Sequence, residues 1–250
     1  MNPLRIERHE RLGTPSDPAP VAIDAAHVWE LADEFILGHS DFAYVAGELA
    51  AYATDDAADS SMFLMAYDGD RCIGFLHADA PRHDNTHHVH VEFRVLPGID
   101  AVVVLDAVWP HFLDYCREEE RTSITFWEQS RQDSPTIDAA SGDGAVESTP
   151  VTEWLTAKGF VLDQVEIAST LDVAAAAEAR PSGEDVGVAK QGRYRLRTWA
   201  GPTPPELIDG MARLHTWNAG ENRWMLAINR ELGFAPTSAL GAWEAATAGS

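Results

Sequence analysis

The hydrophobic positions of the chain first follow a strand and then two helices. Leu4–His9 alternates between apolar and polar residues, which is typical of a short β-strand. After a proline-rich loop, the apolar residues of Ile23–Leu37 recur with the spacing of an α-helix, and Phe42–Tyr52 continues with a second helical stretch. The first helix is predicted to bury one stripe, made of Val28, Leu31, Ala32, Phe35 and Ile36.

A hairpin is the clearest feature of the next segment. Met62–Tyr67 and Cys72–Ala78 are apolar runs joined through Asp68-Gly69, a dipeptide that favours tight hairpin turns. A further turn leads into the strand His87–Leu96, which Pro97-Gly98 ends. Three strands in sequence are therefore expected here.

Helices and strands alternate again in the following segment. Pro110 is expected either to kink the first of these helices or to mark its start, and Gly159 is expected to cap the second. The predicted elements are the helix Val102–Arg117, the strand Ser123–Trp127, a polar loop Gln129–Ser148, the helix Thr149–Lys158 and the strand Phe160–Leu171.

Residues 174–192 lack any apolar period and are rich in Ala, Gly, Glu and Pro, which predicts a linker. We therefore divide the chain into residues 1–173, the linker, and a short second segment, residues 193–250. The second segment is expected to contain a strand Tyr194–Trp199, a helix from Thr203 to about His215, and a helix Asn222–Leu232 capped by Gly233.

Two landmarks occur in the same order in both segments. A basic strand opens each one, LRIERH at Leu4 and YRLRTW at Tyr194, and a helix ending in Gly-Phe closes each one, WLTAKGF at Phe160 and NRELGF at Phe234. About 156 residues separate the landmarks in the first segment and about 40 in the second, whereas one domain usually needs ~100. The second repeat is therefore predicted to lack roughly 115 residues.

Composition narrows the classes of partner. The 250 residues are 45% hydrophobic and carry a formal charge of −22, which disfavours binding to nucleic acid or to anionic membranes. The negative charge either attracts cationic ligands or only keeps the chain soluble. Cys72 and Cys116 show no disulfide or zinc spacing, and no apolar leader or span occurs, so a cytoplasmic protein is expected.

The segment TWNAGENRWMLAINRELGFAP, from Thr216 to Pro236, resembles the closing motif of GNAT acetyltransferases in the form found in bacterial tandem-GNAT proteins. The first segment resembles the same superfamily in FLMAYDGDRCIGFLHADAP, HVEFRVLP and AKGF. The resemblance implies an α+β fold with a mixed, mostly antiparallel sheet flanked by helices, plus a partial second copy. It also implies that strands four and five splay apart to admit acetyl-CoA, whose thioester an amine attacks.

The same resemblance implies particular site residues. Phe93 and Val95 on the fourth strand, together with Asn218 and Asn222, match positions that bind the pantetheine arm of the cofactor. The two asparagines would share one face of a helical start, or Asn222 is only a helix N-cap and Asn218 a solvated surface residue. Glu92 on the fourth strand would accept the proton of the amine, or it is only a solvated glutamate.

The phosphate-binding positions of the family are altered in this chain. The family places a basic residue and two glycines where this sequence has Asp100, Val103 and Leu105. A carboxylate repels a diphosphate, and branched side chains fill the space that the phosphates need. Many family members also use a tyrosine as general acid, at the positions that Leu155 and Asn229 hold here.

Two hypotheses of function follow. The first is an N-acetyltransferase that uses acetyl-CoA to acetylate a small-molecule amine, and the second is a non-catalytic remnant that serves as a binding or assembly module. In the second case, apolar surface left by the incomplete copy is expected to drive formation of a homodimer. No metal site is predicted, since the histidines between His83 and His90 lack a nearby cysteine pair or matched carboxylates.

Overall fold

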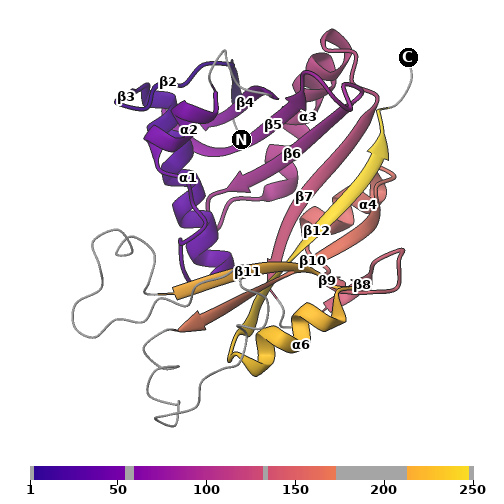
Figure 1. The fold of residues 1–250 in the computed structure, drawn as a ribbon. Coiled ribbons are helices and arrows are strands. Elements are labelled where there is room, and N and C mark those ends of the chain that lie inside the picture. The colour runs from indigo at the N-terminus through magenta and orange to yellow at the C-terminus, as the bar shows by residue number, and fades with distance from the viewer. Residues whose placement is uncertain (1–2, 54–58, 132–134, 173–212, 248–250) are drawn as a thin grey trace, which may run out of the picture.

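One large sheet forms the centre of the molecule (Figure 1). The computed structural model describes residues 3–53, 59–131, 135–172 and 213–247. The eight strands lie in the order β1-β4-β5-β6-β7-β12-β10-β11, and every neighbouring pair is antiparallel except β6 and β7. The strands are β1 (Arg5–His9), β4 (Asp59–Asp68), β5 (Arg71–Pro81), β6 (His88–Val95), β7 (Ser123–Arg131), β10 (Val161–Asp172), β11 (Arg213–Ala219) and β12 (Ala235–Ala246). The predicted mixed, mostly antiparallel sheet is confirmed.

Helices cover both faces of this sheet. Phe75 of β5 packs against Trp29 of α1, with ring centroids 5.5 Å apart, whereas the next residue toward the N-terminus, Gly74, faces Val104 of α3. Because neighbouring strand residues point to opposite faces, α1 and α3 lie on opposite sides of the sheet. The helices are α1 (Pro20–Leu37), α2 (Ala46–Tyr52), α3 (Ala101–Glu118), α4 (Pro150–Ala157) and α6 (Arg223–Glu231).

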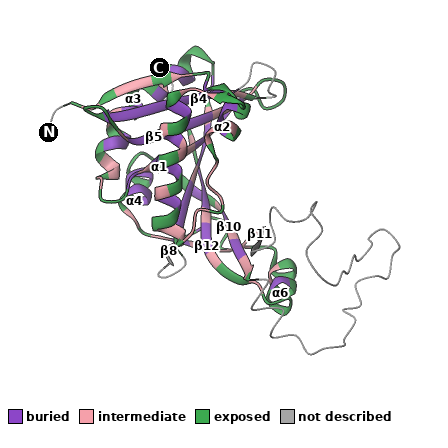
Figure 2. Cartoon of the chain, turned by 90° about the vertical axis from the view of Figure 1, so that its left-hand side faces the viewer, coloured by how far each residue is buried: buried purple, intermediate pink, exposed green. Residues whose placement is uncertain are grey.

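The core lies between the sheet and these helices. Its largest fully buried side chains include Phe63, Phe75, Phe112 and Trp243, and Figure 2 shows the buried stretches concentrated along the central strands. Pro110 lies inside α3, so this helix begins at Ala101 and not at the proline. No helix in the described part of the chain is both long enough and apolar enough to cross a membrane.

The repeated Gly-Phe landmark has the same local structure both times. α4 leads through Gly159 and Phe160 into β10, and α6 leads through Gly233 and Phe234 into β12. Both glycines adopt a left-handed conformation, with φ of 89° and 92°, which a glycine reaches without steric cost. In each repeat, the amide of the Phe donates to the carbonyl five residues earlier, at 3.0 and 2.9 Å. The sequence repeat is therefore a structural repeat.

The two repeats exchange strands within the sheet. β10 and β12 pair with each other, β12 also pairs with β7, and β10 also pairs with β11. Trp127 of β7 lies opposite Ala242, and Trp217 of β11 lies opposite Ala168, and each alanine is the eighth residue after its Gly-Phe. An approximate two-fold axis therefore runs between β10 and β12, and the last strand separates two strands of the first segment.

Two expectations about local structure were wrong. The helix predicted to run to about His215 cannot end there, because residues 213–219 form β11 through pairing with β10, which places Asn218 in a strand. The predicted polar loop Gln129–Ser148 contains ordered strands, because β12 extends β7 to Arg131 and β8 (Pro135–Asp138) pairs with β9 (Ala145–Glu147). Pairing with a distant strand explains β11 and the longer β7, whereas β8 and β9 form a local hairpin.

Several predicted features lie outside the described residues, namely the linker 174–192, the strand Tyr194–Trp199 and the start of the helix at Thr203. The division of the chain into residues 1–173 and 193–250 therefore stays a prediction. The described strands of the second segment, β11 and β12, belong to the same sheet as the first segment. A short ribbon of β2 (Gly13–Thr14) and β3 (Asp17–Pro18) precedes α1.

Candidate functional site

The parallel strands β6 and β7 separate partway along their length. Their ladder runs from the pair His88–Ser123 to the pair Glu92–Trp127 and stops there, although both strands continue, to Val95 and Arg131. A cleft of about 480 Å³ lies where they have parted. It is lined by residues 93–99 and Ala101, by residues 128–131, by Ala32, Phe35 and Ile36 of α1, and by Glu147, Thr149, Pro150 and Val151. We call it the β6–β7 cleft.

A second cavity of about 310 Å³ lies beside the last pair of that ladder. Its walls are aromatic rings and carboxylates, with two histidines between them, and they come from α1, α2, β4, β5, β6 and β7. The lining residues are Trp29, Tyr44, Leu49, Tyr52, Asp59, His77, Asp79, His90, Glu92 and Trp127. We call it the acidic pocket. Glu92 and Trp127, the last pair of the parallel ladder, line this cavity, and the residues that follow them, Phe93 and Glu128, line the cleft.

His77 organises the floor of the acidic pocket. Its Nε2 atom lies 2.8 Å from Ser61 Oγ and 3.1 Å from Asp79 Oδ1, and its Nδ1 atom lies 3.8 Å from Glu92 Oε2. Burial lowers the pKa of His77, but hydrogen bonds and charges from Asp79 and Glu92 outweigh this and raise it to about 9. The ring stacks on Phe63 at a centroid distance of 4.2 Å. His77 is therefore a cation at neutral pH.

The carboxylates around His77 are held ionised. Burial raises the pKa of Glu92, but the His77 hydrogen bond and the charge of Arg94 outweigh it, so the net shift is downward. Asp79 follows the same balance, with burial opposed by His77 and the net pKa lowered. With Asp59 also on the wall, three carboxylates face one imidazolium, and the pocket carries net negative charge.

Aromatic rings form the opposite wall of the acidic pocket. Tyr44 lies edge-on to Trp29 at 4.9 Å and to Tyr52 at 5.2 Å between ring centroids, and the two tyrosine hydroxyls are 3.3 Å apart. Burial, the Tyr52 hydrogen bond and the nearby charges of Glu92 and Asp79 all raise the pKa of the Tyr44 phenol. Aromatic faces together with negative charge are what a small cation needs.

A buried arginine connects the parted strands. The Arg94 guanidinium donates to Asp33 Oδ1 at 3.0 Å, to the Gln129 side-chain oxygen at 3.3 Å and to the Phe93 carbonyl at 3.0 Å, and both ionic side chains are almost wholly buried. Burial raises the pKa of neighbouring Glu128 to about 8, and the charge of Arg94 only partly opposes this. The base of the β6–β7 cleft is thus ionic and not purely apolar.

Sequence reasoning missed this bridge between the parted strands. A usable signal existed in Asp33, which interrupts the apolar stripe of α1 one turn after Trp29. A carboxylate at a core position requires a buried partner.

The N-terminus of α3 closes one end of the β6–β7 cleft and carries its own carboxylate. Asp100 is the N-cap, and its Oδ1 accepts from the amides of Val102 at 3.0 Å and Val103 at 3.4 Å. The side chain of Leu105 is fully buried. These amides are the groups that would otherwise bind an anion at this helix end, so the helix end does not fit a diphosphate.

The predicted site residues divide into two groups. Glu92 lines the acidic pocket, and Phe93 and Val95 line the β6–β7 cleft. Asn218 and Asn222 line neither cavity. Asn218 donates to Thr216 Oγ1 in β11, and Asn222 caps α6 by accepting from Met225 N at 3.2 Å. The roles of all five in catalysis or cofactor binding stay predictions.

The positions compared with the family's general acid offer no proton donor. Leu155 is a fully buried aliphatic residue in α4, and Asn229 is a buried amide in α6. Cys72 and Cys116 are both free thiols, and burial raises the pKa of each, to about 11 and about 12. Neither thiol is activated as a nucleophile.

Comparison with known proteins identifies the fold through solved structures and not through the sequence. No family model matches the sequence, and no curated protein matches it. A tandem GNAT protein from the clavulanic acid biosynthesis pathway superposes with a TM-score of 0.64 at 15% identity, over 98% of this chain and 100% of that one. A GCN5-related N-acetyltransferase from Sphaerobacter thermophilus superposes with a TM-score of 0.53 at 11% identity, over 99% and 96% of the two chains.

Proposed function

We propose that this chain, which has the fold of the GNAT acetyltransferases, binds a small cationic amine in the acidic pocket. The observation that carries the proposal is the position of that pocket. Glu92 and Trp127, the last pair of the parallel ladder, line it, and the β6–β7 cleft is lined by the residues that follow them on both strands. In this fold the amine acceptor and the acyl donor must meet where those strands part, so a pocket at this point is suited to the acceptor.

The chemistry of the walls supports an amine over a neutral or anionic ligand. Asp59, Asp79 and Glu92 outnumber the one cationic side chain, His77, and Tyr44 and Trp127 supply aromatic surface. A protonated amine would satisfy carboxylate oxygens and lie against ring faces at the same time.

Glu92 acts mainly as an electrostatic anchor in this proposal. Its pKa is lowered, and a carboxylate of low pKa is a weak base, so it stabilises the ammonium form more than it removes a proton. A role as general base would require the amine to displace His77, whose nearest contact with Glu92 is already long at 3.8 Å. The lowered pKa of Glu92 therefore supports binding of the ammonium form.

A second candidate function is transfer of an acetyl group from acetyl-CoA to the bound amine. The β6–β7 cleft favours it, because its volume of about 480 Å³, lined by Phe93, Val95 and Val151, lies in the range of small-ligand pockets. The end of the cleft opposes it, because the Asp100 carboxylate occupies the amides that a diphosphate would need. We therefore place amine binding first and transfer second.

The test of amine binding is titration calorimetry of the full chain with primary alkylamines and diamines, each compared with the alcohol of the same length. The proposal predicts saturable binding of amines only, weakened at least tenfold by Glu92→Gln and by Asp79→Asn. Asp68→Asn, at the exposed end of β4, is the matched control and should bind as the parent does. Equal binding of alcohols, or no loss in either pocket variant, would refute the proposal.

The test of acetyl transfer uses the amine that binds best. The chain is incubated with that amine and acetyl-CoA, and release of free thiol is followed over time. Turnover that stops in Glu92→Gln and continues in Asp68→Asn would establish the second function. Amine binding without any thiol release would leave the chain a non-catalytic binding module.

A further inference from the structure

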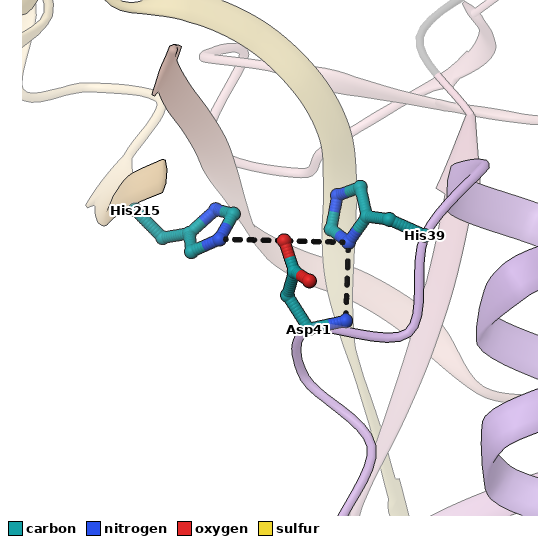
Figure 3. A group of neighbouring side chains, drawn as sticks. All are labelled: His39, Asp41 and His215. Carbon is teal, nitrogen blue, oxygen red and sulfur yellow. Dashed lines mark hydrogen bonds and ion pairs between the residues drawn. The ribbon is translucent and has the colours of Figure 1, made fainter. Parts of the chain in front are cut away.

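Two imidazoles and a carboxylate converge where the second segment meets the first. His39 and Asp41 follow α1, and His215 lies on β11. Figure 3 shows both rings beside the Asp41 carboxylate, and His39 Nδ1 also accepts from the backbone amide of Asp41 at 3.3 Å, a hydrogen bond that a metal ion would replace. Asp41 Oδ2 lies 3.2 Å from His215 Nε2 and 3.5 Å from His39 Nδ1. Within the described residues, no other group of three His, Cys, Asp or Glu side chains brings its ligand atoms this close, all within 4.8 Å.

These separations match a shared metal ion. Two ligand atoms bound to one tetrahedral Zn²⁺, at about 2.0–2.1 Å each, lie roughly 3.3 Å from one another. The two contacts of Asp41 already have that length. The remaining separation, between His39 and His215, is within 4.8 Å, which a small rotation of either ring can shorten.

A chain of hydroxyls fixes the tautomer of His215. Thr237 Oγ1 donates to the Ala168 carbonyl, so the Thr170 hydroxyl, 3.2 Å away, donates to Thr237 and accepts from His215 Nδ1 at 2.9 Å. The Nδ1 atom therefore carries the proton, and the Nε2 lone pair points at the carboxylate. Two acceptors 3.2 Å apart require a cation between them, either a second proton on the ring or a metal.

Aromatic side chains pack around the two histidines, whereas the side chain of Asp41 is 32% exposed. The ring of Phe42 lies 5.4 Å from that of His39, 4.6 Å from that of His215 and 5.0 Å from that of Trp217, measured between centroids. The side chain of His39 is only 8% exposed. This apolar surround limits access of water to the two imidazoles, while Asp41 stays open to solvent.

We propose that His39, Asp41 and His215 bind a divalent transition-metal ion of the Zn²⁺ type. Imidazole nitrogen favours Zn²⁺, Co²⁺ and Ni²⁺ over the oxygen-seeking Mg²⁺ and Ca²⁺. None of the three residues lines the β6–β7 cleft or the acidic pocket. The ion is structural: it joins the loop after α1 to β11, and thus ties the second segment to the first. The proposal does not rest on amine binding.

The experiment is titration of the metal-free full chain with Zn²⁺ in the calorimeter, repeated with Co²⁺ while its visible absorption is recorded. The proposal predicts one high-affinity equivalent, a tetrahedral or five-coordinate Co²⁺ spectrum, and a raised melting temperature. Asp41→Asn and His215→Ala should abolish this binding, and Thr170→Val should weaken it about tenfold through loss of the tautomer-fixing bond. His111→Ala, an exposed histidine of α3, is the matched control.

Two results would overturn the proposal. One is absence of Zn²⁺ binding at stoichiometric concentration, which would leave only a proton between His215 and Asp41. The other is binding that persists in both Asp41→Asn and His215→Ala, which would assign it to other histidines. Far-UV circular dichroism establishes that each variant is folded, and Thr170→Val, which removes no ligand, gives a second reading if His215→Ala unfolds.

Discussion

Asp100 has two opposite effects that substitution can separate. Its carboxylate caps α3 through the amides of Val102 and Val103, and the same charge repels a diphosphate at that helix end. Asp100→Asn keeps a good cap and removes the charge, whereas Asp100→Ala removes both. We expect Asn to leave stability nearly unchanged and Ala to lower the free energy of unfolding by about 1 kcal/mol.

Both variants lose the charge and should therefore bind acetyl-CoA more tightly, and Asp100→Ala also frees the amides of Val102 and Val103. Asp100 is exposed, so its repulsion is screened by water and amounts to about 1 kcal/mol for each phosphate charge at ~4 Å. Removing it from a diphosphate with two charges therefore gains about 2 kcal/mol, or roughly 30-fold in affinity. The gain should shrink as ionic strength rises.

The assay is calorimetric titration with acetyl-CoA at low and high salt, alongside urea unfolding of the three proteins. Tighter acetyl-CoA binding in both variants with a stability loss only in Asp100→Ala supports the account. Parent binding as tight as that of the variants would show that Asp100 does not repel the cofactor. An Asp100→Ala variant as stable as the parent would show that Asp100 does not cap the helix.

Three further predictions concern stability and assembly. The pKa of His77 rises from an ordinary 6.5 to about 9, so its contribution to the free energy of unfolding, at most about 3 kcal/mol, is full below pH 6.5 and is lost as pH rises through 9. Urea unfolding at pH 6.5 and 9.5 should therefore show a smaller pH dependence of stability in His77→Gln than in the parent, and an equal dependence would contradict this. Arg94→Met leaves the Asp33 carboxylate buried without its partner, which should lower the free energy of unfolding by about 3–5 kcal/mol. Adding Asp33→Ala should restore part of that stability in urea unfolding, and no restoration would show that the unpaired carboxylate is not the cause of the loss. Trp224 of α6 is 85% exposed beside Met225, Ile228 and Leu232, so we expect light scattering to show a second copy of the chain associating through this face and Trp224→Ala to weaken it; a mass that stays monomeric at every concentration would exclude it.

Local patterns predicted the order of elements well because they depend on neighbours in the sequence. The hairpin of β4 and β5 follows from Asp68-Gly69, and both Gly-Phe caps follow from residues within one helical turn. β11 was assigned in part to a helix because its strand conformation depends on β10, more than forty residues earlier. Periodicity within a segment carries no information about such a partner.

The candidate site was predictable only in part for the same reason. Glu92, Phe93 and Val95 were predicted as site residues through resemblance, and all three lie where β6 and β7 part, although their roles stay predictions. The acidic pocket was not foreseen, because its aromatic and acidic walls come from six elements. The contacts of Arg94 with Asp33 and of Asp41 with His215 likewise join residues 61 and 174 positions apart.

A crystal structure of the full chain grown with its best-binding primary amine tests the central claim most directly. The account predicts the ammonium nitrogen within hydrogen-bonding distance of Glu92 or Asp79, with the carbon chain against Tyr44 or Trp127. An amine seated elsewhere at saturating concentration, with the acidic pocket holding only water, would contradict it.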